Sequence, residues 1–160
     1  MAARIRCATQ PAGAAHGDGG NADATTPVIA LDLEHHSWRS FEGITCLIQL
    51  TVGASVVTTV VTKNGEEDVT TTTELLPPHD FLIDVLVPEV RASIGGALGP
   101  ALADPSVVKV LHGADSDVLW LQRDFGLYLV NLFDTGVASR RLAYPSHALA
   151  HLLEVVVVRE

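Results

Sequence analysis

The chain has few of the residues that would tie it to an oxidising compartment or to a membrane. Only two of its 160 residues are cysteine, Cys7 and Cys46. Two cysteines are too few for a disulfide framework or a four-cysteine metal site, and they fit the reducing interior of a cell. No apolar run approaches the roughly 20 residues that a membrane-spanning helix requires. We therefore expect no membrane partner.

Positive charge is also scarce. Lysine and arginine together number 10, against 19 aspartates and glutamates, and the net charge at pH 7 is −9. This balance argues against a broad, non-specific nucleic-acid-binding surface, because such surfaces are normally basic. It is compatible with an acidic site that binds metal ions, which in turn bind phosphate.

The first part of the chain lacks any pattern that could order it. Residues 1–27 are rich in alanine, glycine and threonine and show no apolar periodicity, so we expect a disordered leader. Arg4 and Arg6, with no acidic residue nearby, are compatible with an organelle transit peptide, whereas Asp18 and Asp23 argue against one.

Residues 28–160 are predicted to form one folded domain, since the chain is 48% hydrophobic and long enough for a real core. β-Branched runs dominate its first half and helical periodicity its second half. We expect a β-meander with a hairpin turn at Asn64-Gly65, then interleaved helices, which together make an α/β domain with a mixed sheet. Strands are predicted at 28–34, 43–52, 55–62, 69–76, 80–86, 106–111 and 128–133, and helices at 88–104, 115–126, 134–143 and 145–156.

Two carboxylates stand where the first predicted strand ends. Asp32 and Glu34 are two residues apart in "VIALDLEHH" and therefore share one face of the strand. Paired carboxylates on one face repel each other unless a cation lies between them. The alternative is an exposed strand end with solvated acids.

A second acidic cluster, "HGADSD", also follows a short apolar strand and opens a predicted helix. Asp117 falls in the first turn of that helix, where the helix dipole favours an anion. Helix capping is an alternative role, although Asp115 or Ser116 could supply it as well. With Asp32 and Glu34, Asp117 completes three carboxylates at the ends of two strands, a plausible site for hard divalent ions.

These residues carry a resemblance to a known family. The strings "DLEHHSWRSFEG" and "HGADSDVLWLQRDFG" resemble the 3′-5′ exonuclease domain of the DEDD superfamily, specifically the nuclear exosome-associated exoribonuclease group related to ribonuclease D. The resemblance covers most of residues 28–50 and 80–154. It implies an RNase H-like fold, a mixed sheet flanked by helices. It also implies removal of single nucleotides from RNA 3′ ends, in rRNA maturation or RNA decay, with two divalent ions, Mg²⁺ or Mn²⁺.

The resemblance also assigns roles to individual residues. It implies that Asp32 bridges both ions, that Glu34 holds the ion next to the attacking water, and that Asp117 holds the ion at the leaving group. It places His35 and Trp120 against the terminal nucleotide, where an aromatic face can stack on any base. Trp120 is alternatively a core residue at helical spacing.

The same resemblance implies the cellular setting of the chain. Its partners would be the 3′ end of a single-stranded RNA and the nuclear exosome. Its location would be the nucleus or nucleolus, with an organelle left open by the leader.

Two features depart from the family pattern. Family members carry a third motif, a tyrosine followed four residues later by an aspartate, and no such pair follows "LAHLLE" before Glu160. We expect the domain at 28–160 to be C-terminally incomplete and its activity to be in doubt, which makes an inactive RNA- or partner-binding module the main alternative. The Val- and Thr-rich insertion within 51–79 is either a long hairpin or an artefact of an imperfect gene model.

A remote alternative comes from another enzyme class. Asp134-Thr135-Gly136 follows two apolar residues, as around the catalytic acid of an aspartic protease. That chemistry needs two aspartates that share a proton, from two lobes or a dimer. The helical period of the segment that follows argues against it, and the family resemblance makes Asp134 a helix cap instead.

Overall fold

The computed structural model describes residues 27–38, 41–53, 55–63 and 66–156, with the backbone alone for the strands between residues 55 and 76. The expected leader, apart from Pro27, and the Asn64-Gly65 turn lie outside the described residues. The elements in chain order are β1 (Val28–His36), β2 (Ile44–Val52), β3 (Ser55–Lys63), β4 (Glu66–Leu76), β5 (His79–Asp84), α1 (Pro88–Ala103), β6 (Val108–Leu111), α2 (Asp115–Phe125), β7 (Leu132–Asp134), α3 (Thr135–Arg141) and α4 (Leu149–Val156).

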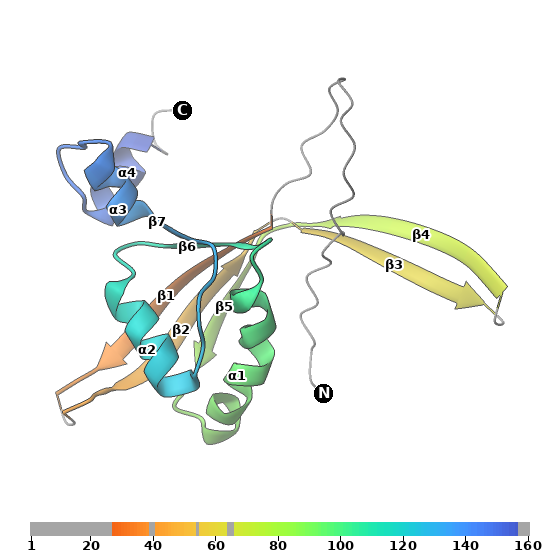
Figure 1. Ribbon diagram of the computed structural model, residues 1–160, viewed down its shortest axis with the longest axis horizontal. Coiled ribbons are helices and arrows are strands. Elements are labelled where there is room, and N and C mark those ends of the chain that lie inside the picture. The colour runs from red at the N-terminus through yellow and green to blue at the C-terminus, as the bar shows by residue number, and fades with distance from the viewer. Residues whose placement is uncertain (1–26, 39–40, 54, 64–65, 157–160) are drawn as a thin grey trace.

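Five strands form the main sheet, in the order β5-β2-β1-β6-β7 (Figure 1). The pairs β1–β2 and β2–β5 are antiparallel, whereas β1–β6 and β6–β7 are parallel. Parallel neighbours need a crossover connection, and α1 and α2 each lie in the segment that leads to a parallel strand. The predicted α/β architecture with a mixed sheet is therefore confirmed.

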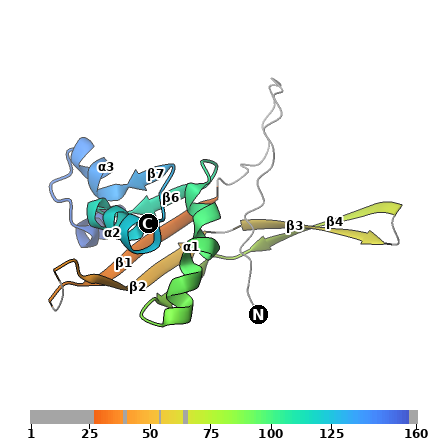
Figure 2. The same ribbon diagram turned by 60° about the horizontal axis from the view of Figure 1, so that its bottom comes forward.

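The strands β3 and β4 form a sheet of their own. They pair antiparallel with each other along most of their length, from Ser55↔Leu76 to Lys63↔Glu66. Figures 1 and 2 both show this hairpin extending away from the main sheet. The predicted meander is therefore wrong, because β2 pairs with β5, from Val52↔His79 to Leu47↔Asp84, rather than with β3.

The hydrophobic core lies between the main sheet and the helices α1 and α2. Alternate residues of β1 face it, and the core also takes three residues from α1 and one from α2. Those residues are Ile29, Leu31, Leu33, Ile94, Leu98, Leu102 and Leu121, each at most 6% exposed. Burial of each such side chain stabilises the fold by about 1.5–3 kcal/mol. Asp32 and Glu34, at the intervening positions, face the opposite side of the sheet.

Helix α2 begins at its predicted start, Asp115, and ends at Phe125, one residue before the predicted end. Gly126 follows it with φ +65°, a left-handed conformation that glycine adopts without steric cost, and its amide bonds back to the helix. Leu121 is buried and Val118 packs against the core, whereas Leu119 is 58% exposed. The polar Asp117 is buried as well.

Two elements, β7 and α4, begin four residues later than predicted. The strand expected at 128–133 begins only at Leu132, because Asn131 has φ +59° and interrupts the extended backbone. The last helix begins at Leu149 instead of Pro145. The residues ahead of it form a turn in which the Ser146 hydroxyl accepts a hydrogen bond from the amide of Ala148. Within the described residues, no helix is both long and apolar enough to cross a membrane.

Candidate active site

The edge of β1 carries the acidic site. Strand β6 pairs with β1 only from Val28 to Ala30, so β6 does not cover the later residues of that edge. The first turn of α2 lies against this free edge, and the Asp117 carboxylate accepts a hydrogen bond from the Leu33 amide. Asp117 therefore accepts the hydrogen bond of an amide, that of Leu33, which a longer β6 would have paired. This position also brings Asp117 close to Asp32.

This placement disfavours the charge of Asp117. The side chain is buried, with the residue 7% exposed. Burial, followed by the negative charge of Asp32, raises the pKa of Asp117 to about 6, although the Leu33 amide opposes the rise. Asp134 adds a weaker repulsion to the same carboxyl. The two predicted acids Asp32 and Asp117 thus form an interacting pair whose repulsion a bound cation would relieve.

Glu34 lies on the same strand and the same face as Asp32, but the structure does not gather all three acids. Among the described residues, no three His, Cys, Asp or Glu side chains are grouped so that they could hold a metal ion. The donor chemistry fits Mg²⁺ or Mn²⁺, because carboxylate oxygens are the ligands such hard ions prefer. The fold brings Asp32 and Asp117 together. Glu34 is assigned to the same site because it lies two residues after Asp32 on β1.

His35, the residue after Glu34 in β1, meets Trp120 of α2. Their rings are stacked, with the centroids 4.2 Å apart and the planes 3° from parallel. A break in register between Glu34 and His35 marks this point of β1. Trp120 also packs partly against the core, which is the alternative role considered for it from the sequence.

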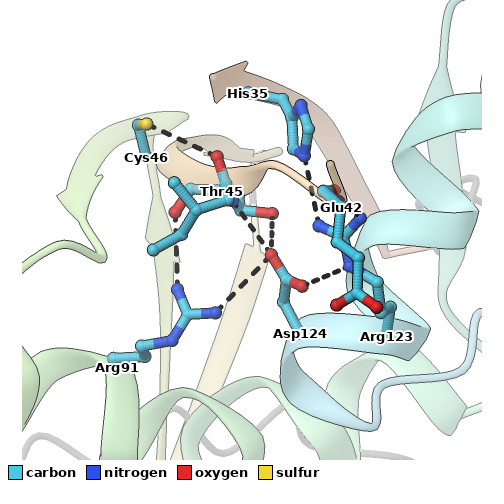
Figure 3. A network of polar contacts seen from close by, with 8 residues as sticks. His35, Glu42, Thr45, Cys46, Arg91, Arg123 and Asp124 are labelled. Carbon is cyan, nitrogen blue, oxygen red and sulfur yellow. Dashed lines mark hydrogen bonds and ion pairs between the residues drawn. The ribbon is translucent and has the colours of Figure 1, made fainter. Parts of the chain in front are cut away.

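Arg123 connects the ring of His35 to α2 (Figure 3). Its Nη2 lies 3.1 Å from Nε2 of His35, its Nη1 donates to the main-chain carbonyl of Glu42, and its Nε donates to Oδ1 of Asp124 over 2.6 Å. An arginine can only donate, so Nε2 of His35 accepts in this contact. The guanidinium therefore joins β1, the β1–β2 connection and α2.

Asp124 is the buried centre of the same network. The backbone amide and the hydroxyl of Thr45 donate to its Oδ2 over 2.9 and 2.7 Å, and Arg91 forms an ion pair with that oxygen at 3.5 Å (Figure 3). Burial opposes the charged form of Asp124. The hydrogen bonds from Arg123 and Thr45 outweigh burial, so the pKa of Asp124 lies well below its usual range.

Asp134 ties two strand ends together. It caps α3 by accepting from the amides of Gly136 and Val137 over 2.7 and 3.0 Å. It also accepts from Gly113 and Ala114, the turn that leads into α2, over 3.0 and 2.8 Å. Burial opposes its charge, but these four amides hold its pKa below the usual range. The predicted cap is confirmed, and a carboxylate engaged in this way does not suit the shared proton of a protease.

The network around Arg123 and Asp124 was not predicted from the sequence. The contacts that Arg123 and Asp124 make with His35, Glu42 and Thr45 span 79 to 88 residues along the chain. No spacing rule joins a helix end to a strand start at that separation. The one available signal was the polar pair Arg123 and Asp124 near the end of a helix with apolar periodicity. The hydrogen bonds from the amides of Gly113 and Ala114 to Asp134 could not be predicted from the sequence either.

The sheet order, the helical layer and the acidic pair at the edge of β1 place this chain in the RNase H-like class of nuclease folds. A family model described as 3′-5′ exonuclease matches residues 20–159. The chain therefore belongs to the 3′-5′ exonuclease family, as the resemblance predicted.

Relatives within that family are similar over most of the chain. Exosome complex component 10 of Homo sapiens is 47% identical over 127 residues, which cover 79% of this chain and 11% of the relative. Exosome complex exonuclease RRP6 of Saccharomyces cerevisiae is 42% identical over 129 residues, 81% of this chain and 14% of the relative. The crystal structure of the catalytic core of RRP6 from Trypanosoma brucei has a TM-score of 0.60 at 38% identity, covering 83% of this chain and 29% of that one. The chain thus spans only a small part of its relatives.

Proposed function

We propose that this domain is a 3′-5′ exoribonuclease that shortens single-stranded RNA one nucleotide at a time, with Asp32, Glu34 and Asp117 as the acids of its active site. The observation that carries the proposal is the Asp32–Asp117 pair at the free edge of β1, where Asp117 is buried and its pKa is raised to about 6. Both acids belong to the strings that resemble the family, and the relatives include proteins named as exosome exonucleases.

The three carboxylates would hold two divalent ions, which supply activation of the attacking water and stabilisation of the leaving 3′ oxygen. This chain's own part is to fix the acids. Asp117 is fixed by the Leu33 amide, and Asp32 and Glu34 are fixed by the pairing of β1 with β2. The stacked rings of His35 and Trp120 offer an aromatic surface for the terminal base.

The cellular role proposed here follows the relatives. Two of them are named as exosome components or exonucleases. We infer that the RNA substrate is delivered by an exosome, in rRNA maturation or RNA decay, in the nucleus or nucleolus. The domain is proposed to occupy residues 28–160.

The test is an RNA-shortening assay. The purified chain is given a 5′-labelled single-stranded RNA with Mg²⁺ or Mn²⁺, and the products are resolved at single-nucleotide resolution. We expect a ladder of products shortened from the 3′ end. The D32N variant should slow the reaction at least about a hundredfold, because it removes a charge from the metal-holding set.

D80N is the matched control. Asp80 is an exposed acid of β5, and its carboxylate accepts a hydrogen bond from Thr51. D80N should keep the wild-type rate. RNA binding without shortening would refute the proposed reaction and support the inactive binding module. Equal rates in D32N and wild type would refute the assigned site.

A further inference from the structure

We propose that Arg123 is a positioning residue that holds the ring of His35 flat against Trp120, so that the two rings form one rigid stacking platform for a nucleobase. The inference deepens the proposed function and rests on it for the identity of the ligand. It concerns Arg123, for which the sequence suggested no role.

The first step is the spacing of the rings. Ring planes in contact are about 3.5 Å apart, and a base inserted between two rings needs about twice that distance. The His35 and Trp120 centroids are 4.2 Å apart with nearly parallel planes, so no base fits between them. A base can therefore stack only on an outer face of the pair, and the pair acts as one extended surface.

The second step is what fixes the rings. His35 follows the register break of β1 and pairs with Thr45 of β2, a pairing that fixes its backbone but not the orientation of its ring. Arg123 contacts its Nε2, and Arg123 is itself held by Asp124 and by the Glu42 carbonyl. Asp124 is fixed in turn by Thr45, which is fully buried. The orientation of His35 is thus set by a chain of contacts that ends in the core.

The third step is the space beside the ring. Gly43 has φ +67°, and a Cβ built there would overlap the His35 ring and approach the carbonyl of His36. A glycine at this position therefore lets the β1–β2 connection lie directly against His35. Arg123 and the backbone at Gly43 therefore both lie against the ring of His35.

The experiment uses the fluorescence of Trp120. Trp38, which is 92% exposed, is first changed to phenylalanine so that Trp120 is the single tryptophan. Acrylamide quenching and the affinity for adenosine 5′-monophosphate in Mn²⁺ are then measured for W38F alone and with R123K. Lysine keeps the charge but, as a single point donor, cannot contact His35, Asp124 and Glu42 together. R141K, in the last turn of α3, is the matched control.

We expect R123K to raise the quenching constant of Trp120 about twofold and to weaken nucleotide binding about fivefold, because a base loses part of its stacking surface. R141K should leave both values unchanged. G43A is a second variant, which should displace His35 and give the same two changes. Its control is G126A, at φ +65° with no atom within 4 Å of the added Cβ.

Unchanged quenching in both R123K and G43A, with circular dichroism showing folded protein, would overturn the proposal. Increased quenching with unchanged nucleotide affinity would overturn the platform role. A failure of the proposed function looks different. In that case no variant shortens RNA, while the effect of R123K on quenching and nucleotide binding remains.

Discussion

The carboxyl of Asp117 lies where folding disfavours its charge. Its pKa rises from 3.8 to about 6 because of burial and of Asp32. A rise of this size lowers the free energy of unfolding by about 3 kcal/mol at a pH where Asp117 is ionised. That cost is tolerated in a fold whose net stability is typically about 5–15 kcal/mol. The site is therefore locally unstable without a cation, as expected of residues arranged for binding rather than for packing.

Replacing Asp117 by asparagine should stabilise the metal-free protein. In wild type the penalty is absent below about pH 4, grows as the pH rises through the window from 3.8 to about 6, and is complete above it. Asparagine cannot ionise and still offers an oxygen to the Leu33 amide. We expect D117N to be more stable than wild type by about 2–3 kcal/mol at pH 8, and by nearly nothing at pH 4.

Urea unfolding in EDTA at the two pH values measures this difference. D84N is the control, since Asp84 is an exposed acid at the end of β5. A D117N protein less stable than wild type at pH 8 would show that the charge of Asp117 is satisfied within the fold, contrary to the account.

At the scale of elements, Asp134 joins the end of β7 to the turn between β6 and α2. Its carboxylate serves four backbone amides on two segments. A cap that bonds only its own helix typically contributes about 1 kcal/mol. Because Asp134 also orders the turn ahead of Asp117, its loss should affect both the fold and the site.

We expect D134A to lower the free energy of unfolding by about 2–4 kcal/mol, since it leaves several partly buried amides without their acceptor. Thermal or urea unfolding measures the loss. D104A is the comparison, because the Asp104 side chain accepts hydrogen bonds from the amide and the hydroxyl of a single nearby residue, Ser106, rather than from two segments. If D134A costs no more than D104A, then Asp134 is not the junction described here.

The sequence predicted these elements well where local signals were strong. β-Branched runs, Gly126 and the Asp134 cap position located β1, α2 and the start of α3. The sequence also placed Asp32 and Asp117 in one site, although Asp32 lies in the middle of β1 (Val28–His36) and not at its end. The sequence did not predict contacts between segments far apart in the chain, such as the hydrogen bond from Thr45 to Asp124, 79 residues away. It also did not predict the positive φ of Asn131, which delays the start of β7 to Leu132.

At the scale of the whole molecule, the β3–β4 hairpin stands apart from the main sheet. Its strands pair with each other, whereas β2 pairs directly with β5, beginning at Val52↔His79. Figures 1 and 2 show the hairpin projecting beyond the helix-covered body. The insertion therefore leaves the five-stranded sheet and its acidic edge intact.

Removing the hairpin should leave the domain folded. A variant with residues 54–77 replaced by Asn-Gly keeps Gly53, whose amide bonds the carbonyl of Val28, and closes β2 onto β5 by a short turn. We expect its free energy of unfolding to lie within about 1 kcal/mol of the wild-type value, because a shorter loop also costs less closure entropy. Loss of cooperative unfolding would show that the hairpin supports the main sheet.

The central claim is that Asp32 and Asp117 form a cation-binding pair at the free edge of β1. Titration of the metal-free chain with Mn²⁺ at pH 8, followed by isothermal calorimetry, tests it most directly. We predict saturable binding by the wild type, weakened about tenfold or more in D32N and in D117N, and weakened at pH 5, where Asp117 holds its proton. Absence of binding by the folded wild type, or equal affinity in D117N, would contradict the claim.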